Sequence, residues 1–339
     1  MKVSELGEFG LIARLSEALG AHPTLDAADR LAVGIGDDAA VWRANGSALI
    51  ATTDTLVAGV HFLADRAPWR DVGWKALVVN VSDIAAMGGT PEFALVTLAL
   101  PENTQVEAID ELYAGVAEAA EAYGVVITGG DVVRSPTTVI TIALTGRAAL
   151  DDTGKALVLR RDAAQAGDVV AVTGQLGGAA GGLRRLRDSA KESSGPLVER
   201  QLRPCARVQA GQAALAAGVR CAIDVSDGLL QDLGQVCRAS GLGGVVWRDK
   251  LPIDPALSEV FAPEEALRFA AGGGEDYELL LIGDQQTIGA AAKQADVPVT
   301  VIGEMVIDAK QEAKLLDEAG EEVSIPSAGW DHLRSGGES

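Results

Sequence analysis

The sequence has few cysteines and histidines, and it lacks the motifs of several large enzyme classes. It contains three cysteines, Cys205, Cys221 and Cys237, with no CxxC pair, which favours buried thiols in a reducing compartment over a disulfide framework. With three histidines and no HExxH motif, it gives no support to a zinc site. GxxxxGK[ST], HRDxxxxN, DFG and GxSxG are also absent, which excludes a P-loop enzyme, a protein kinase and a serine hydrolase with a nucleophile elbow.

Positive charge and long apolar runs are scarce as well. The chain has 28 Lys and Arg against 48 Asp and Glu, for a formal net charge of -20. Such a protein repels nucleic acid and anionic membranes, so neither is an expected partner. If its substrates are anions, divalent cations must neutralise the site. No secretory signal and no apolar run of about 18 residues is visible, so we expect a cytoplasmic protein.

The length and the pattern of apolar residues predict two domains. A chain of 339 residues exceeds one comfortable core. Strands are predicted at 48–52, 93–99, 125–128, 138–145, 168–173, 221–226, 277–282 and 299–302, and helices at 74–87, 105–123 and 227–240. The polar, turn-rich segment 149–167 is the expected junction, which gives domains 1–149 and 150–339. Strands and helices in both halves predict an α/β domain followed by an α+β domain.

Glycine is abundant, and several glycine clusters fall between predicted elements. The segment 174–182 (GQLGGAAGG) is predicted to be a turn. Gly129 and Gly130 precede Asp131, and residues 272–274 precede Glu275. Bare backbone N–H groups in such turns can hold phosphate, although glycine clusters are equally typical of ordinary loops.

Aspartate recurs where apolar runs end. The residues that share this position are Asp37, Asp38, Asp54, Asp131, Asp224 and Asp227, and Asp83 lies within the first predicted helix. Each one alone is also typical of a turn or a helix N-cap. As a set they would repel one another if they met at one crevice, and hard cations with oxygen ligands would relieve that repulsion. The set therefore favours a metal–phosphate site.

Eight motifs in order resemble the bacterial thiamine-monophosphate kinase family, within the superfamily of aminoimidazole ribonucleotide synthetase. They are GEFGLI (7–12), GIGDDAAV (34–41), TTDTLVAGVHF (52–62), KALVVNVSDIAAMG (75–88), TGGD (128–131), IDVSDGL (223–229), GGEDYELL (273–280) and GWDH (329–332). The resemblance implies the fold of that superfamily, with an N-terminal domain that binds ATP and Mg²⁺ and dimerises through its sheet.

The resemblance also implies roles for individual residues. The implied metal ligands are Asp38, Thr52, Thr53, Asp54, Asp83, Asp131, Asp224 and Asp227. The implied ATP contacts are Gly130, Asp131, Arg161 and Ser226. The implied contacts to thiamine phosphate are His61, Glu275 and Trp330. Whether Arg160 or its neighbour Arg161 meets ATP, and what Asp37 does, stay open.

The implied reaction is direct, Mg²⁺-assisted transfer of a phosphoryl group from ATP to thiamine monophosphate in a homodimer, without a dedicated catalytic base. This would be the final step of thiamine diphosphate biosynthesis. Two alternatives remain at this point: another ATP-using member of the superfamily, such as a ribonucleotide cyclo-ligase, and a non-catalytic protein that binds cations or nucleotides.

Overall fold

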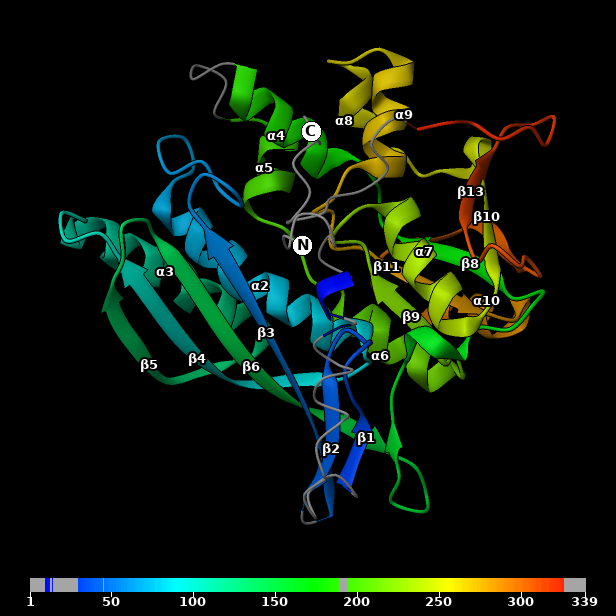
Figure 1. The fold of residues 1–339 in the computed structure, drawn as a ribbon, viewed down its shortest axis with the longest axis horizontal. Helices are drawn as coiled ribbons and strands as arrows, with labels where there is room; N and C mark the ends of the chain where they lie inside the picture. Colours follow the sequence, from blue (N-terminus) through cyan, green and yellow to red (C-terminus); the bar gives the residue numbers. More distant parts are fainter. Residues whose placement is uncertain (1–9, 13, 15–29, 45, 189–193, 326–339) are drawn as a thin grey trace.

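The protein contains two β-sheets with helices packed against both of them (Figure 1). The structure is a computed structural model and describes residues 10–12, 14, 30–44, 46–188 and 194–325. The first sheet has the strand order β1-β2-β3-β6-β4-β5, and β7 pairs with β6. Its strands are β1 (Leu31–Val33), β2 (Ala40–Ala44), β3 (Ser47–Val57), β4 (Thr90–Leu100), β5 (Val126–Arg134), β6 (Val139–Leu150) and β7 (Ala156–Leu157).

The first sheet buries one face and leaves part of the other exposed. Along β6, Ile140, Ile142 and Leu144 are buried, and the residues between them are more accessible. This period of two is the pattern of a sheet covered on one side. The covering layer is α2 (Trp69–Ala86) and α3 (Val106–Tyr123), which lie behind the sheet in Figure 1.

The two covering helices approach each other backbone to backbone through glycine. A Cβ atom added at Gly115 would lie 1.7 Å from the carbonyl oxygen of Arg70, and one added at Gly73 would lie 1.9 Å from that of Leu112. No side chain fits at either distance, so the two glycines set the spacing between α2 and α3. Helix α3 then ends at Gly124, whose φ of 68° is the left-handed conformation expected of a C-terminal glycine.

The second sheet is covered on both faces. Its strand order is β13-β10-β12-β8-β11-β9. The strands are β8 (Val169–Thr173), β9 (Cys221–Asp224), β10 (Gly243–Trp247), β11 (Leu279–Gly283), β12 (Val299–Val306) and β13 (Ala313–Leu316). In β11, Leu280 and Ile282 join a core with α7, and Leu279 and Leu281 join a core with α6 and α10. The apolar run of this strand follows from burial on both sides.

Seven α-helices and two short 3₁₀ turns accompany the second sheet in the described residues. They are α4 (Gly178–Asp188), α5 (Pro196–Leu202), α6 (Val208–Ala217), α7 (Leu229–Ser240), α8 (Pro255–Ser258), α9 (Pro263–Gly272), α10 (Gln285–Gln294), η2 (Arg161–Ala163) and η3 (Arg248–Lys250). None of the helices in the described part of the chain is long and apolar enough to span a membrane.

Helix α2 lies between the two sheets and belongs to both cores. Leu77, Val78 and Val81 pack in the core of the first sheet, and Ala86 packs with Ala214 and Leu279 in a core of the second. This explains a difference from the sequence, which predicts one apolar face for the helix. In the structure α2 is buried on nearly all sides.

The predicted elements are all present, but two glycine segments differ from expectation. Helix α4 begins at Gly178, inside the predicted turn 174–182. On this helix, a Cβ atom at Gly182 would lie 2.0 Å from the carbonyl oxygen of Leu197 on α5. These glycines therefore permit close helix packing. Gly129 and Gly130 lie within β5 and not in a turn, and a Cβ atom at Gly130 would lie 1.7 Å from the oxygen of Val96 on β4.

The contact between α2 and α3 gives a stability prediction. Gly115→Ala should lower the free energy of unfolding by roughly 3 kcal/mol, because the added methyl group must push two backbones apart. Gly289→Ala on α10 is a matched control, since nothing lies within 4 Å of its added Cβ atom. The control should gain roughly 0.5–1 kcal/mol from helix propensity. Urea unfolding of both variants measures the difference, and equal stability for the two would contradict the packing argument.

Candidate functional site

Carboxylates from three distant parts of the sequence meet where α2 passes between the sheets. Asp38 follows β1, Asp83 lies on α2, and Asp224 ends β9. One oxygen of each carboxylate lies within 4.8 Å of the other two. The structure thus brings together three of the aspartates singled out in the sequence.

Neighbouring polar side chains hold this cluster in place. Thr52 on β3 donates a short hydrogen bond to Asp83, and the buried Ser82 hydroxyl donates to Asp224 at 2.6 Å. The backbone N–H of Asp54 donates to Oδ1 of Asn80 at 3.0 Å, which ties β3 to α2. Thr53 instead donates its hydroxyl to the carbonyl oxygen of Ile142 on β6 at 3.1 Å.

Arg161 is the cation that faces the cluster. Its Nη2 and Nε atoms donate to the two oxygens of Asp38 at 2.7 and 3.1 Å, in a bidentate pair. Arg160 points elsewhere and pairs with Asp162, two residues along the chain. Asp37 lies at the back of the pair, where its carboxylate accepts the N–H of Asp38 at 3.0 Å and that of Arg161 at 3.3 Å. It therefore fixes the backbone on both sides of the ion pair.

Burial and mutual repulsion make ionisation of this cluster costly. Burial, together with the charge of Asp38, raises the pKa of Asp224 to about 8 and that of Asp37 to about 7. Burial, then the charges of Asp54 and Asp224, raises the pKa of Asp83 well above its ordinary value. Asp54 is thus electrostatically part of the cluster.

The donor set fits a hard divalent cation. The three carboxylate oxygens lie within 4.8 Å of one another, so an ion that prefers oxygen ligands, such as Mg²⁺, would draw them together around itself. Several carboxylates face one guanidinium, and a cation would offset the remaining negative charge. Asp38, Asp83 and Asp224 are the residues best placed to hold such an ion.

The turn that contains Ser226 and Asp227 packs directly against the glycine-rich segment. The N–H of Glu275 donates to the carbonyl oxygen of Ser226 at 2.8 Å. A Cβ atom at Gly274 would lie 2.5 Å from that same oxygen. At Gly228, with a φ of 125°, a Cβ atom would lie 2.7 Å from the oxygen of Gly272. Here the glycines allow two loops to touch.

Glu275 is held by residues from both domains. Nζ of Lys75, which is buried on α2, lies 2.6 Å from its Oε1, and Nε2 of Gln201 on α5 donates to its Oε2 at 2.5 Å. Its φ of 70° is strained for a residue with a side chain. The structure therefore fixes this carboxylate in a defined direction. Burial, and then the charges of Glu275, Asp54 and Asp224, raises the pKa of the nearby Tyr277 well above its ordinary value.

His61 closes the turn after β3. The N–H of Val57 donates to its Nδ1 at 2.9 Å, so Nδ1 is an acceptor and the ring proton lies on Nε2. The imidazole therefore has one nitrogen committed to the turn.

Two groups of expected site residues are not part of this cluster. Asp131 is exposed on β5 and accepts the N–H of Val132 at 2.9 Å, three strands from β3 in the same sheet. Gly130 lies beside it in the strand. Trp330 lies outside the described residues, as does the first half of the GEFGLI motif, residues 7–9.

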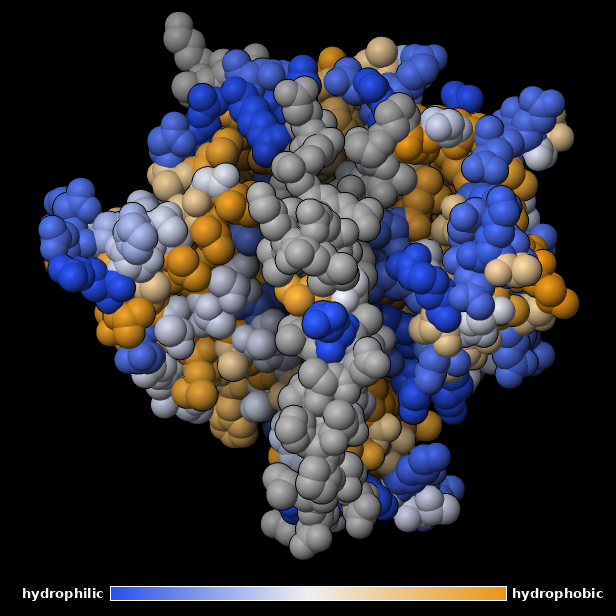
Figure 2. All heavy atoms as spheres, in the orientation of Figure 1, coloured by the Kyte–Doolittle hydropathy of each residue, from blue (hydrophilic) through white to orange (hydrophobic). Residues whose placement is uncertain are grey.

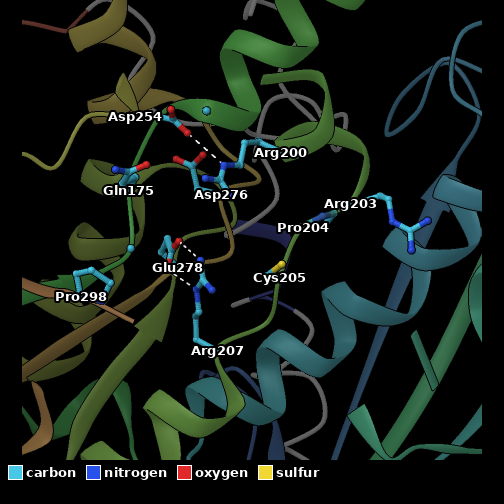
Figure 3. Close-up of a pocket in the computed structure, with 12 residues that line it drawn as sticks. Gln175, Arg200, Arg203, Pro204, Cys205, Arg207, Asp254, Asp276, Glu278 and Pro298 are labelled. Atoms are coloured by element: carbon cyan, nitrogen blue, oxygen red, sulfur yellow. Dashed lines mark hydrogen bonds and ion pairs between the residues drawn. The ribbon is translucent and has the colours of Figure 1, made fainter. Parts of the chain in front are cut away.

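A separate hollow of about 200 Å³ opens beside α4 and the connection from α5 to α6 (Figure 3). Arginines and carboxylates line it, and each of the arginines is paired. Arg203 pairs with Asp71 and Glu118, which lie outside the lining. Arg200 donates to Asp254 at 3.2 Å, and Arg207 donates to Glu278 at 2.7 Å. Because these charges are already compensated, the hollow does not present a free cationic site for phosphate.

Several residues that support the site were not singled out from the sequence. Lys75, Asn80 and Ser82 are all buried on α2, within the KALVVNVSD segment. A polar residue in an otherwise apolar, buried helix needs a hydrogen-bond partner, and this requirement could have indicated from the sequence that the three residues support a site. The partners of Lys75 and Ser82, which are Glu275 and Asp224, come from the other domain and could not be identified from spacing.

The raised pKa values predict how the metal-free protein responds to pH. Asp37, Asp224 and Asp276, with pKa values of about 7, 8 and 8, bind protons more tightly folded than unfolded. Their contribution to stability is full below about pH 4 and is lost as the pH rises through about 7 to 8. Carboxyls with a lowered pKa, such as Glu118 at about 2, stay ionised over the upper part of this range.

In EDTA the free energy of unfolding should therefore fall by roughly 1–3 kcal/mol between about pH 5.5 and about pH 8. Excess Mg²⁺ should reduce the fall, because it favours the ionised carboxylates. Asp224→Asn should reduce the same fall in the free energy of unfolding in EDTA, with no Mg²⁺ added. Denaturant titrations at both pH values test this, and a stability that rises with pH in EDTA would contradict the burial argument.

Comparison with known proteins assigns the chain to a family. Residues 36–148 match the family model of the AIR synthase related protein, N-terminal domain, and residues 165–315 match that of its C-terminal domain. The thiamine-monophosphate kinase of Escherichia coli (strain K12) is 38% identical over 335 residues, covering 96% of this chain and 98% of that protein. The thiamine-monophosphate kinase of Bacillus subtilis (strain 168) is 32% identical, with 97% and 100% covered.

A solved structure agrees. AaThiL complexed with AMPPCP and TMP superposes with a TM-score of 0.83 at 32% identity, covering 98% of this chain and 99% of that chain. The two-sheet fold, the aspartate cluster between the sheets and the similarity over nearly the whole length lead to one conclusion: this chain belongs to the thiamine-monophosphate kinase family.

Proposed function

We propose that this protein transfers a phosphoryl group from ATP to thiamine monophosphate, giving ADP and thiamine diphosphate, the last step of thiamine diphosphate biosynthesis. The observation that carries the proposal is the convergence of Asp38, Asp83 and Asp224 beside Arg161, between two domains. A related protein with this fold was solved with AMPPCP and TMP, and that complex supports the choice of both substrates.

The proposed site divides into three groups of residues. Asp38, Asp54, Asp83, Asp224 and Asp227 hold Mg²⁺, with Thr52, Thr53 and Asp131 as further ligands. Ser226, Arg161, Gly130 and Asp131 contact ATP. Glu275, His61 and Trp330 contact thiamine phosphate. We propose domains of 1–149 and 150–339, and each of the three groups contains residues from both.

Bound Mg²⁺ would supply charge neutralisation for two polyanionic substrates and for the transferring phosphoryl group. The protein's own task is to orient them. Arg161, fixed on Asp38, presents its remaining N–H groups beside the cluster, and Glu275, fixed by Lys75, marks the substrate side. The acceptor is already a phosphate anion, so direct in-line transfer needs no catalytic base.

We also propose that the protein is a homodimer built on the first sheet. Five large apolar residues on and beside the open face of this sheet are between 46% and 67% exposed: Phe93, Leu95, Val126, Val132 and Val133. Hydrophobic side chains gather over β3, β6, β4 and β5 on the face seen in Figure 2. An apolar area of this kind favours burial against a second copy.

Dimerisation would also give Asp131 a role. Through β4 and β6, its register places it opposite Thr55 on β3, about 14 Å away at the usual strand spacing. That separation is too long for it to share an ion with Asp54 in one chain. A second copy packed on this face would bring its own Asp131 toward the cluster.

Asp83→Asn tests the metal role. The change removes one carboxylate from a crowded anionic site, so turnover should fall roughly 100- to 1,000-fold in saturating Mg²⁺. The metal-free variant should be as stable as the parent or more so. Asp110→Asn on the exposed side of α3 is the matched control and should keep full activity. Near-normal turnover by Asp83→Asn would rule out the proposed metal site.

Substrate choice tests the mechanism. Thiamine monophosphate should be phosphorylated and free thiamine should not, because thiamine brings neither a nucleophilic phosphate oxygen nor a group that can bind the shared Mg²⁺. ADP release is measured with each compound at equal concentration and excess Mg-ATP, and products are identified by mass. Comparable conversion of thiamine would point to a hydroxyl kinase. ADP release that depends on neither compound would refute the proposed function.

A further inference from the structure

A buried carboxylate on α7 has no part in the function proposed above. Asp232 is fully buried, although its helix packs Leu229, Leu233 and Val236 into the core of the second sheet. An ionisable group in such surroundings is retained only if several hydrogen bonds compensate it. Its partners therefore indicate what it does.

Asp232 fastens the turn that contains Ser226 and Asp227. Its Oδ2 accepts the backbone N–H groups of Asp227 and Gly228, both at 3.0 Å. Both N–H groups precede α7, which starts at Leu229, so the hydrogen bonds within the helix do not use them. The carboxylate thus caps its own helix from one turn inside and fixes the direction of the Asp227 backbone.

Gln235, one turn further along α7, links this carboxylate to Arg161. Its Nε2 donates to Oδ1 of Asp232 at 3.2 Å, and its Oε1 accepts Nη1 of Arg161 at 2.6 Å. Both ends of the amide are engaged, one with an anion and one with a cation, so its orientation is determined. Nε and Nη2 of the same guanidinium donate to Asp38.

The result is a continuous chain of hydrogen bonds across the site. It runs from Asp38, in the first domain, through Arg161 and Gln235 to Asp232, and ends at the peptide of Asp227 in the second domain. A carboxylate at position 235 would compete with Asp38 for the guanidinium of Arg161. An apolar residue there would remove the hydrogen bond that holds this guanidinium. A neutral amide supports Arg161 and leaves the bidentate pair intact.

We propose that Gln235 is a positioning residue for the nucleotide half of the site. It holds the Arg161 guanidinium on Asp38 and, through Asp232, sets the turn of Ser226 and Asp227. Its effect falls on Mg-ATP and not on thiamine phosphate, because Glu275 is held by Lys75 and Gln201 and His61 by Val57, outside this chain of bonds. This inference rests on the proposed function for its choice of ligand.

The test is Gln235→Leu, which removes both hydrogen bonds at similar volume and keeps helix propensity. Loss of a hydrogen bond to a charged group should raise the KM for Mg-ATP about tenfold or more. The KM for thiamine phosphate should stay within about twofold and the Tm should change little. Gln294→Leu on α10 makes the same chemical change away from the site and should alter none of these quantities.

Calorimetric titration with Mg-AMPPCP separates this inference from the proposed function, because it needs no turnover. Weaker Mg-AMPPCP binding by Gln235→Leu supports the positioning role even if the parent fails to phosphorylate thiamine monophosphate. Unchanged Mg-AMPPCP binding overturns it even if the parent is an active kinase. A clearly lower Tm, together with the same loss of affinity for both substrates, would also overturn it, since this result would indicate a general structural role. If Gln235→Leu does not fold, Gln235→Ala removes the same bonds and must show the same selective loss.

Discussion

Repulsion between carboxylates is the constraint on which this structure depends. Oxygens of Asp38, Asp83 and Asp224 come within 4.8 Å of one another, and the Arg161 guanidinium pairs with Asp38. Left alone, that arrangement favours protonation or separation of the domains that carry the aspartates. Thr52 and Ser82 offset part of this repulsion, because their hydroxyl groups donate to Asp83 and Asp224. Asp37 adds a further carboxylate, and it contributes by accepting the backbone N–H groups of Asp38 and Arg161.

The position of α2 makes such a cluster possible. A helix packed on one sheet would leave Asp83 facing solvent, whereas α2 is enclosed between two sheets and carries its polar residues inward. Lys75 and Asn80 on the same helix connect it to Glu275 and Asp54. One helix thus orients groups on the substrate side and on the metal side together.

Much of the fold and of the site follows from the sequence. Period-two and helical patterns predicted the strands and long helices. The aspartate pattern singled out Asp38 and Asp224 after apolar runs and Asp83 within a helix, and the three carboxylates meet in the structure. The glycines were harder to interpret. Gly129–Gly130 and residues 178–182 resemble loops in sequence, but they serve close packing of β5 on β4 and of α4 on α5. Sequence shows that a side chain is missing there but not which neighbour requires it.

The partners of buried polar residues were beyond the sequence for a similar reason. Lys75 in the first domain meets Glu275 in the second, and Arg161 meets Asp38 from 123 residues away. Such pairs depend on how two domains dock, and no local pattern encodes that docking. Asp131 is a further case, since its exposed position on β5 gives it no partner among the cluster residues of its own chain.

The shared burial of α2 has a consequence for how the molecule opens. Because its apolar residues complete the cores of both sheets, neither domain can release the helix without exposing the other's interior. Opening at the domain boundary is then coupled to global unfolding, and the amide hydrogens of α2 belong to the slowest class to exchange with solvent. The candidate site is therefore assembled on a helix that the cores of both sheets protect.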